Sequence, residues 1–243
     1  MVFLNRKLLI ITGIVVVFVV VLLLLLYLFV FRGGATPVTL KAAVEVVEKN
    51  QDAKEKSSSG SRNSMATGEV TWSVDASQDV FVGYRVNEEL VGKGAFTAIG
   101  RTDFVSGFLV IDGENLIEAT FEADLSYLKS DNTFRDGALR TQAIESAKYP
   151  KTSFTLIKPI VLGASFFSGE PVSILLKGNF NLHDITREIE IAVDGQLVND
   201  TIVVVSSFTI LFSDYGIEKP SSGRVLSIED QGIVEIQLFF TVE

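Results

Sequence analysis

The sequence predicts an all-β protein, an antiparallel barrel or sandwich with one short helix, preceded by an N-terminal transmembrane helix. Three observations support this fold class. After residue 67, about ten segments alternate apolar and polar residues at regular spacing, which is typical of antiparallel strands. One stretch between them, near residues 130–149, carries helix signals instead. Finally, the N-terminus contains an apolar run long enough to cross a membrane.

That apolar run is Leu8–Phe31, 24 residues without a charged side chain. As a helix it would be about 36 Å long, more than the roughly 30 Å of a hydrocarbon core. A cleaved signal peptide is the alternative, but its apolar region would be only about 7–15 residues, and no cleavage site is evident before Arg32. We expect residues 1–32 to be a cytoplasmic stub and an uncleaved single-pass anchor.

The orientation of this anchor depends on the flanking basic residues. Arg6 and Lys7 favour a cytoplasmic N-terminus, which would place the following domain outside the cytoplasm. Three basic residues on the other side oppose this orientation: Arg32, Lys41 and Lys49.

Residues 33–66 read as a flexible linker. Val38–Val47 could form a short helix or strand, whereas Asn50–Ser64 has almost no apolar residue and is expected to be disordered. A flexible tether of this length has an end-to-end distance of about 30–35 Å. The remaining residues, 67–243, form the expected barrel domain.

Strand signals follow in order along that domain. The alternating segments are Val70–Val74, Val80–Val86, Ala95–Gly100, Phe104–Ile111, Ile117–Leu125, Ser153–Ile157, Val172–Leu182, Ile189–Val193, Thr201–Phe212 and Gly232–Val242. Turn residues separate several of them, including Asp112-Gly113, His183-Asp184 and Asn199-Asp200. In the clearest strand, Ile117, Ala119, Phe121, Ala123 and Leu125 share one face.

The single predicted helix follows Ser130-Asp131-Asn132, which offers good N-caps. Asp136 precedes Arg140 by four residues, the favourable order for a surface ion pair. Pro150 is expected to end the helix, because the residue before a proline is pushed towards extended geometry.

Motifs in this stretch resemble those of the YceI-like, polyisoprenoid-binding family. The matching residues are Asn132, Arg135, Asp136, Leu139, Arg140, Lys148, Tyr149, Pro150 and Phe154. Further similarity is found at Trp72–Asp75, Phe180–Arg187 and Ser213–Ile217, so the resemblance covers about Gly68 to Glu243. It implies a lipocalin-like barrel that encloses a polyisoprenoid chain.

Three positions depart from the family pattern. Asp184 replaces the usual turn glycine, a tolerable change because Asp visits left-handed geometry. Phe212 stands where the family often has an arginine, and no histidine follows the second strand near Asn87. Both losses bear on contacts to a polar head group.

Composition and motifs exclude several function classes. The chain has no cysteine, one histidine and a formal net charge of −9, which argues against thiolate chemistry, transition-metal sites and nucleic-acid partners. No catalytic motif is present, so we expect no enzyme activity and no catalytic residue. His183 is interpreted as a structural turn residue. Glu118, Glu122 and Asp124 are interpreted as a solvated outer face rather than a hard-cation site.

Arg135 and Arg140 are the best polar candidates for the site. In the functional interpretation, they meet a phosphate or quinone head group at the barrel mouth, since guanidinium suits phosphate recognition. In the structural interpretation, which we favour, they pair with Asp136 and cap nearby carbonyls.

The interior of the barrel can be filled or hollow. The candidate lipid-contacting residues, besides the two arginines, are Tyr84, Phe96, Phe108, Ala119, Phe121, Phe154 and Phe180. Ala119 and Ala123 beside the Phe121 ring suggest space, although Phe108 or Phe154 could fill it. A barrel of eight strands can hold one small ligand.

The sequence therefore favours a membrane-tethered, extracytoplasmic binding protein at the cell membrane. It would enclose an isoprenoid lipid, either a quinone or a prenyl phosphate, for sequestration or carriage, with no obligatory cofactor. The alternative is a structural or interaction module with a filled core, and an enzyme ranks third.

Overall fold

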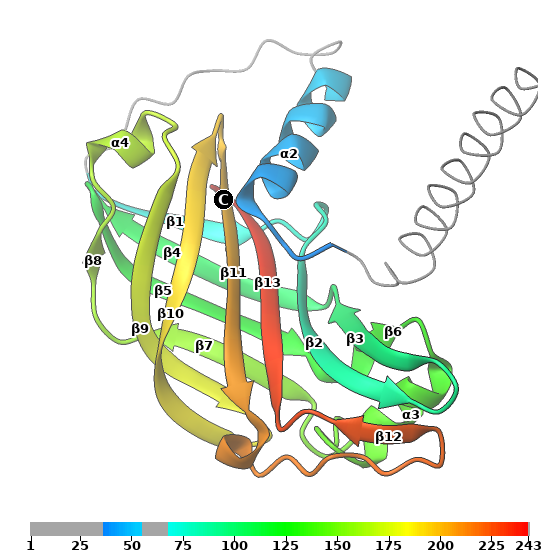
Figure 1. The fold of residues 1–243 in the computed structure, drawn as a ribbon. Helices are drawn as coiled ribbons and strands as arrows, with labels where there is room; N and C mark the ends of the chain where they lie inside the picture. The colour runs from blue at the N-terminus through cyan, green and yellow to red at the C-terminus, as the bar shows by residue number, and fades with distance from the viewer. Residues whose placement is uncertain (1–35, 55–67, 243) are drawn as a thin grey trace, which may run out of the picture. The chain divides into compact units, whose positions relative to one another are not determined.

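The structure is a computed structural model that describes residues 36–54 and 68–242 (Figure 1). Its strands form one antiparallel sheet that closes on itself through the pairing of β13 with β1. The closed ring runs β1-β4-β5-β7-β9-β10-β11-β13, which makes an eight-stranded barrel and confirms the all-β, antiparallel part of the predicted fold class. The ring strands are β1 (Glu69–Val74), β4 (Val105–Asp112), β5 (Asn115–Asp124), β7 (Lys151–Leu156), β9 (Val172–Leu182), β10 (Ile185–Val198), β11 (Thr201–Leu211) and β13 (Gln231–Val242).

At one end, four further strands extend the ring. They are β2 (Phe81–Leu90), β3 (Gly94–Thr102), β6 (Lys129–Ser130) and β12 (Val225–Ile228). β2 pairs with β13, β3 and β12, and β3 pairs with β6, so these strands continue the ladder beyond the ring. A last short strand, β8 (Ile160–Val161), pairs with the start of β5 at the other end. The extended end carries the cavity described below.

The predicted alternation fails at one point of β5. Leu116 pairs with Ile111 while Glu118 pairs with Val110, so Ile117 is an extra residue, a β-bulge. The bulge shifts the register by one, and Leu116 is buried in place of Ile117. Ala119, Phe121 and Ala123 still face the core as expected.

The helix α3 (Thr133–Thr141) begins where the sequence predicts. The Asn132 side chain accepts a hydrogen bond from the backbone N–H of Phe134, as an N-cap does. The helix ends well before Pro150, because Ala143 and Glu145 adopt left-handed backbone angles that a helix cannot contain. The expectation of a single helix is wrong. α2 (Leu40–Lys54), α4 (Ala164–Phe167) and the 3₁₀ turns η1 (Leu125–Tyr127) and η2 (Phe212–Tyr215) are also present.

Helix α2 lies inside the segment expected to be a flexible linker, residues 33–66, and it packs against β10 and β11. Its Ala43 and Val47 are buried, as are the outward-facing Val203 and Val205 of β11. These side chains remove apolar surface from water, which stabilises the docked helix. Residues 40–54 therefore do not act as a free tether.

A buried charge cluster joins the segment ahead of α2 to the barrel. Glu235 of β13 is fully buried, and its carboxylate accepts hydrogen bonds from Arg85 Nε at 2.6 Å and from Arg101 at 3.3 Å. The same carboxylate accepts a hydrogen bond from the backbone N–H of Val38 at 3.1 Å. The chain is thus attached to the outside of the barrel two residues before α2 begins.

The predicted anchor Leu8–Phe31 lies outside the described residues. Within residues 36–54 and 68–242, none of the helices is long and apolar enough to cross a membrane.

Candidate functional site

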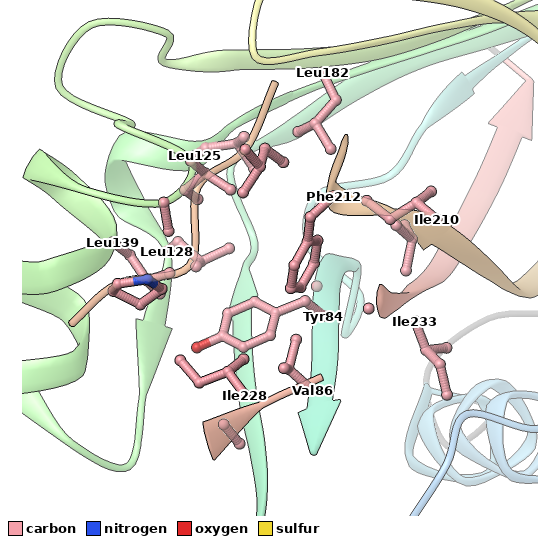
Figure 2. A pocket seen from close by; sticks show the side chains of 18 of the residues that line it. Tyr84, Val86, Leu125, Leu128, Leu139, Leu182, Ile210, Phe212, Ile228 and Ile233 are labelled. Atoms are coloured by element: carbon pink, nitrogen blue, oxygen red, sulfur yellow. The ribbon is translucent and has the colours of Figure 1, made fainter. Parts of the chain in front are cut away.

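A cavity of about 120 Å³, here called the mouth cavity, opens at the extended end of the barrel (Figure 2). Its walls come from β2, β3, β7, β9, β11, β12 and β13, from the turns η1 and η2, and from α3. Most of the lining side chains are apolar, among them Val82, Val86, Ala98, Leu125, Leu128, Leu139, Leu182, Ile210, Phe212, Ile228, Ile233 and Val234. The cavity can hold an apolar ligand that shields this surface from water.

The local structure explains why these residues converge. Val82, Tyr84 and Val86 are alternate residues of β2, so their side chains share the inner face of the strand. Arg135 and Leu139 lie four residues apart on α3, so one face of the helix presents both to the cavity.

Tyr84 lies among these apolar side chains and carries a polar hydroxyl. Its hydroxyl is buried and, among the described residues, has no hydrogen-bond partner. Figure 2 shows the ring inside the cavity among Val86, Phe212 and Ile228. Gly100 on β3 is required beside it, because a Cβ at that position would clash with the Tyr84 ring. Burial raises the pKa of the Tyr84 hydroxyl, so the group is a neutral donor at physiological pH.

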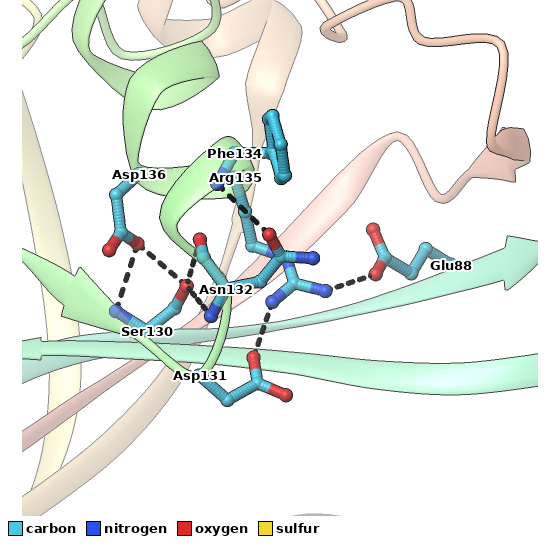
Figure 3. A network of polar contacts seen from close by, with 7 residues as sticks. All are labelled: Glu88, Ser130, Asp131, Asn132, Phe134, Arg135 and Asp136. Carbon is cyan, nitrogen blue, oxygen red and sulfur yellow. Dashed lines mark hydrogen bonds and ion pairs between the residues drawn. The ribbon is translucent and has the colours of Figure 1, made fainter.

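Arg135 is held at the rim of the cavity by two carboxylates (Figure 3). Its guanidinium lies 2.6 Å from Glu88 Oε1 and 2.5 Å from Asp131 Oδ1, and its carbon lies 5.5 Å from the centre of the Phe96 ring. The side chains of Arg135 and Glu88 are only 13% and 7% exposed. Burial lowers the pKa of Arg135, but the hydrogen bond and charge of Glu88 oppose this, and the net pKa is raised.

Asp136 fixes the segment ahead of α3, the helix that carries Arg135. Its Oδ1 accepts hydrogen bonds from Ser130 N at 2.9 Å and from Ser130 Oγ at 2.6 Å. The expected partner of Asp136 was Arg140, and this expectation is wrong. Arg140 instead donates to the carbonyl of Ser126 at 3.4 Å, because Asp136 is already engaged with Ser130. Arg135 thus pairs with carboxylates other than Asp136, and Arg140 caps a backbone carbonyl.

Within the described chain, the basic side chains that line the mouth cavity are both paired. Arg135 is paired with Glu88 and Asp131, and Lys219 with Asp230. Glu218 adds another negative charge to the lining. An anionic head group would therefore meet no free cation here, whereas a neutral acceptor would meet the Tyr84 hydroxyl.

A second cavity of about 50 Å³, here called the inner cavity, lies in the other half of the barrel. The Phe121 and Phe154 rings line it with their centres 6.2 Å apart, and Ala119 lines it as well. The Phe154 ring lies against Gly178, where a Cβ would clash with it. This half is largely filled by side chains, so Ala119 leaves little free space.

The structure separates the predicted lipid-contacting residues into three groups. Tyr84, Phe180 and Arg135 line the mouth cavity, and Ala119, Phe121 and Phe154 line the inner one. Three others line neither: Phe96, Phe108 and Arg140.

The position of each of these three residues outside the cavities has a physical reason. Phe96 lies at the rim beneath the guanidinium of Arg135. Phe108 is exposed on the outside, because Leu109 beside it faces the core and strand residues alternate. Arg140 is exposed on α3.

Sequence reasoning missed Phe212, Leu139 and Ile228 as lining residues. Phe212 could have been found, since an aromatic residue replaces the family's arginine there. Leu139 follows Arg135 by four residues, which also places it on the inner face of the helix. No strand was predicted at β12, so Ile228 gave no signal.

His183 has the structural role expected of it. It forms the two-residue β9–β10 turn with Asp184, and both residues are left-handed. Its Nδ1 donates to the carbonyl of Tyr215 at 2.9 Å, and its Nε2 lies 3.0 Å from Glu145 Oε2. The ring thus joins the segment after α3 to η2.

The carboxylates of β5 are likewise engaged locally. Glu122 pairs with Lys151, and Asp124 accepts hydrogen bonds from Ser126 at the start of η1. Across residues 36–54 and 68–242, no group of three or more potential ligands could hold a metal ion.

Comparisons with known proteins agree with this architecture. A family model described as the YceI-like domain matches residues 72–240. A polyisoprenoid binding domain from Saccharophagus degradans, implicated in plant cell wall breakdown, is 19% identical with a TM-score of 0.56, covering 72% of this chain and 99% of that chain. Burkholderia cenocepacia BcnA is 12% identical with a TM-score of 0.53, covering 68% and 98%. At these identities, the solved structures show the fold alone. No curated protein matches the sequence significantly.

Proposed function

The chain belongs to the YceI-like domain family, whose members are binding proteins with a lipocalin-like barrel, and from this premise we propose that its barrel encloses an isoprenoid lipid. The observation that carries the proposal is the mouth cavity, a mainly apolar chamber with the buried Tyr84 hydroxyl, which has no hydrogen-bond partner in the part of the chain that the structure describes. The polyisoprenoid binding domain of similar fold supports the same ligand class.

Burial of the prenyl chain supplies the affinity. At about 0.8 kcal/mol per buried methylene, one isoprene unit contributes about 4 kcal/mol. The mouth cavity of about 120 Å³ is smaller than the roughly 300–1,000 Å³ of drug-sized ligand pockets. A long chain therefore requires side chains in the largely filled inner half of the barrel to move, which would enlarge the space for the ligand.

The head group is the part that Tyr84 recognises in this proposal. Its hydroxyl donates a hydrogen bond to a neutral acceptor, such as the carbonyl of a quinone. A prenyl phosphate fits less well, because Arg135 and Lys219 are already paired with carboxylates. Phe212 lines the cavity where the family often has an arginine, and this residue also favours a neutral head group over a phosphate.

The setting of the protein is also part of the proposal. Leu8–Phe31 serves as a single-pass anchor, and the barrel lies on the extracytoplasmic side, where it sequesters or carries the lipid. The length of the apolar run and the basic pair Arg6-Lys7 support this arrangement.

Lipid extraction from the full-length protein tests the proposal. The wild type and Ala98→Phe are purified in the same detergent, and their lipids are extracted with organic solvent and weighed by mass spectrometry. Ala98 lines the mouth cavity, so the new ring occupies ligand volume while the anchor is unchanged. An isoprenoid lipid that is present in the wild type and depleted in Ala98→Phe supports the proposal. Equal lipid in both proteins, or none in either, contradicts it.

The filled inner half favours a second candidate, a structural or interaction module without a ligand. In that case Ala98→Phe would have a lower melting temperature than the wild type, because the new ring overpacks a core that holds no ligand to displace. Absence of isoprenoid lipid from the wild type together with this destabilisation would identify the module.

A further inference from the structure

Three strongly exposed apolar side chains gather at the extended end of the barrel. They are Phe134 of α3, Leu226 of β12 and Val91 after β2, and they are 78%, 63% and 55% exposed. A register shift between Val225 and Ser227 leaves Leu226 as a bulged, outward residue. We call these three side chains the mouth patch.

Arg224 connects the three residues of the mouth patch, through its backbone and through its side chain. The backbone N–H of Val91 donates to the carbonyl of Arg224 at 3.0 Å. The Arg224 guanidinium lies 5.5 Å from the centre of the Phe134 ring. Leu226 lies two residues further along the same strand region.

The elements that carry the patch also wall the mouth cavity. Arg135 and Leu139 on α3, Ile228 on β12 and Glu88 on β2 face the cavity. The same short segments therefore present side chains both to the cavity and to the outside. Whatever covers the mouth patch lies at the entrance of the cavity.

The chain length ahead of the barrel determines what can cover the patch. Four residues, 32–35, separate Phe31 from Thr36, the first described residue. With the apolar run in a bilayer, Thr36 lies within about 18 Å of the end of that run.

The barrel itself is fastened close to this point. Val38 bonds to Glu235 beside Arg85, and β2 runs from Arg85 to Leu90 over about 17 Å. The connection from Phe31 to Thr36, about 18 Å at most, is similar in length to the stretch of β2 from Arg85 to Leu90. The mouth patch is thus within reach of the bilayer that holds the anchor.

From this geometry we infer that the mouth patch docks on the surface of a lipid bilayer and sets the cavity entrance against it. This inference rests on the proposed anchor. The nearby charges are mixed, with Arg224 and Lys93 offset by Glu89 and Asp131, and the chain carries a formal net charge of −9. Insertion of apolar side chains therefore drives docking, and a bilayer of zwitterionic lipid suffices.

Depth-dependent fluorescence quenching tests the docking. The full-length chain is reconstituted in phosphatidylcholine vesicles whose acyl chains carry bromine, a contact quencher of tryptophan. The single tryptophan, Trp72, is replaced by phenylalanine, and Phe134→Trp places the probe in the patch. The matched control is Val161→Trp on β8, which is 64% exposed at the opposite end of the barrel.

We expect bromine to quench the tryptophan of the Phe134→Trp protein and to leave that of the Val161→Trp protein bright. Anionic lipid should bring no gain in quenching. Docking is overturned by equal quenching of both proteins, by none in either, or by failure of the chain to join vesicles. The tryptophan emission of the Phe134→Trp protein can also shift with protein density while bromine does not quench it. That result indicates that a second copy of the chain covers the patch, and it also overturns docking.

The same vesicles are extracted for isoprenoid lipid, which separates this inference from the proposed function. Lipid in the barrel without quenching refutes docking alone. Quenching without such lipid supports docking and refutes the proposed ligand.

Discussion

Replacing Tyr84 by phenylalanine removes one oxygen atom from the mouth cavity and leaves the ring beside Gly100. Within residues 36–54 and 68–242, this buried hydroxyl has no hydrogen-bond partner. An unsatisfied buried polar group costs about 1–3 kcal/mol, so Tyr84→Phe should raise the stability of the lipid-free protein by about 1 kcal/mol or more. The same change should weaken lipid binding by about 0.5–1.5 kcal/mol, up to about tenfold, because the head group loses its donor.

Two measurements check these opposite signs. Urea unfolding of delipidated protein gives the free energy of unfolding, and partition of a quinone between vesicles and protein gives the affinity. Tyr127→Phe is the matched control, because that tyrosine is exposed. It should change neither quantity by more than about 0.5 kcal/mol.

Alkaline pH offers an independent check. Burial raises the pKa of Tyr84 above the ordinary value near 10, so the unfolded chain releases this proton first. Below pH 10 the hydroxyl is neutral in the folded and the unfolded states, and above pH 10 stability falls by up to about 1.4 kcal/mol per pH unit. Tyr84→Phe should lack this loss, whereas Tyr215, whose pKa burial also raises, titrates in both proteins.

One outcome would refute the reasoning about Tyr84. If Tyr84→Phe lowered the stability of the lipid-free protein and left quinone affinity unchanged, the hydroxyl would have a structural partner. It would then have no role in recognising the head group.

Three further predictions concern the rest of the barrel. Ala119→Phe should destabilise the protein by about 1–3 kcal/mol in thermal melts, because the inner cavity of about 50 Å³ cannot take a ring; wild-type stability would show that this half is hollow. Glu235→Gln should cost about 2–4 kcal/mol in denaturant unfolding, since it leaves two arginines without a buried carboxylate. Glu122→Gln breaks an exposed pair and should cost less than about 1 kcal/mol, so equal losses would contradict the assigned role of the buried cluster. Ala43→Asp should release α2 and speed hydrogen exchange of its amides, whereas the exposed neighbour Ala42→Asp should not; similar exchange in both variants would show that α2 is not docked.

Much of the fold follows from local chemistry that the sequence displays. The alternation of apolar and polar residues predicted most ring strands, because a strand with one solvent-exposed face needs polar residues at every second position. The turn at His183-Asp184 and the cap at Asn132 were predictable for a similar reason. Each depends on backbone preferences of one or two residues.

Other features depend on partners distant in the chain. The bulge at Ile117 arises from its pairing with β4, and nothing in the local pattern marks the extra residue. Helix α2 was read as part of a linker, because its stability comes from covering Val203 and Val205 rather than from its own composition. The partners of Arg135 were missed because Glu88 lies 47 residues away in the chain.

For the candidate site, the sequence by itself indicated that the inward faces of the strands are apolar and that a long apolar run precedes the barrel. Only the tertiary structure decided which interior residues share a cavity. Tyr84 meets Gly100 through the β2–β3 pairing, which leaves room for its ring and no partner for its hydroxyl. Phe121 and Phe154 meet through β5 and β7 and fill the other half. Cavities form where packing across strands is incomplete, and that is a property of pairs of surfaces rather than of any one segment.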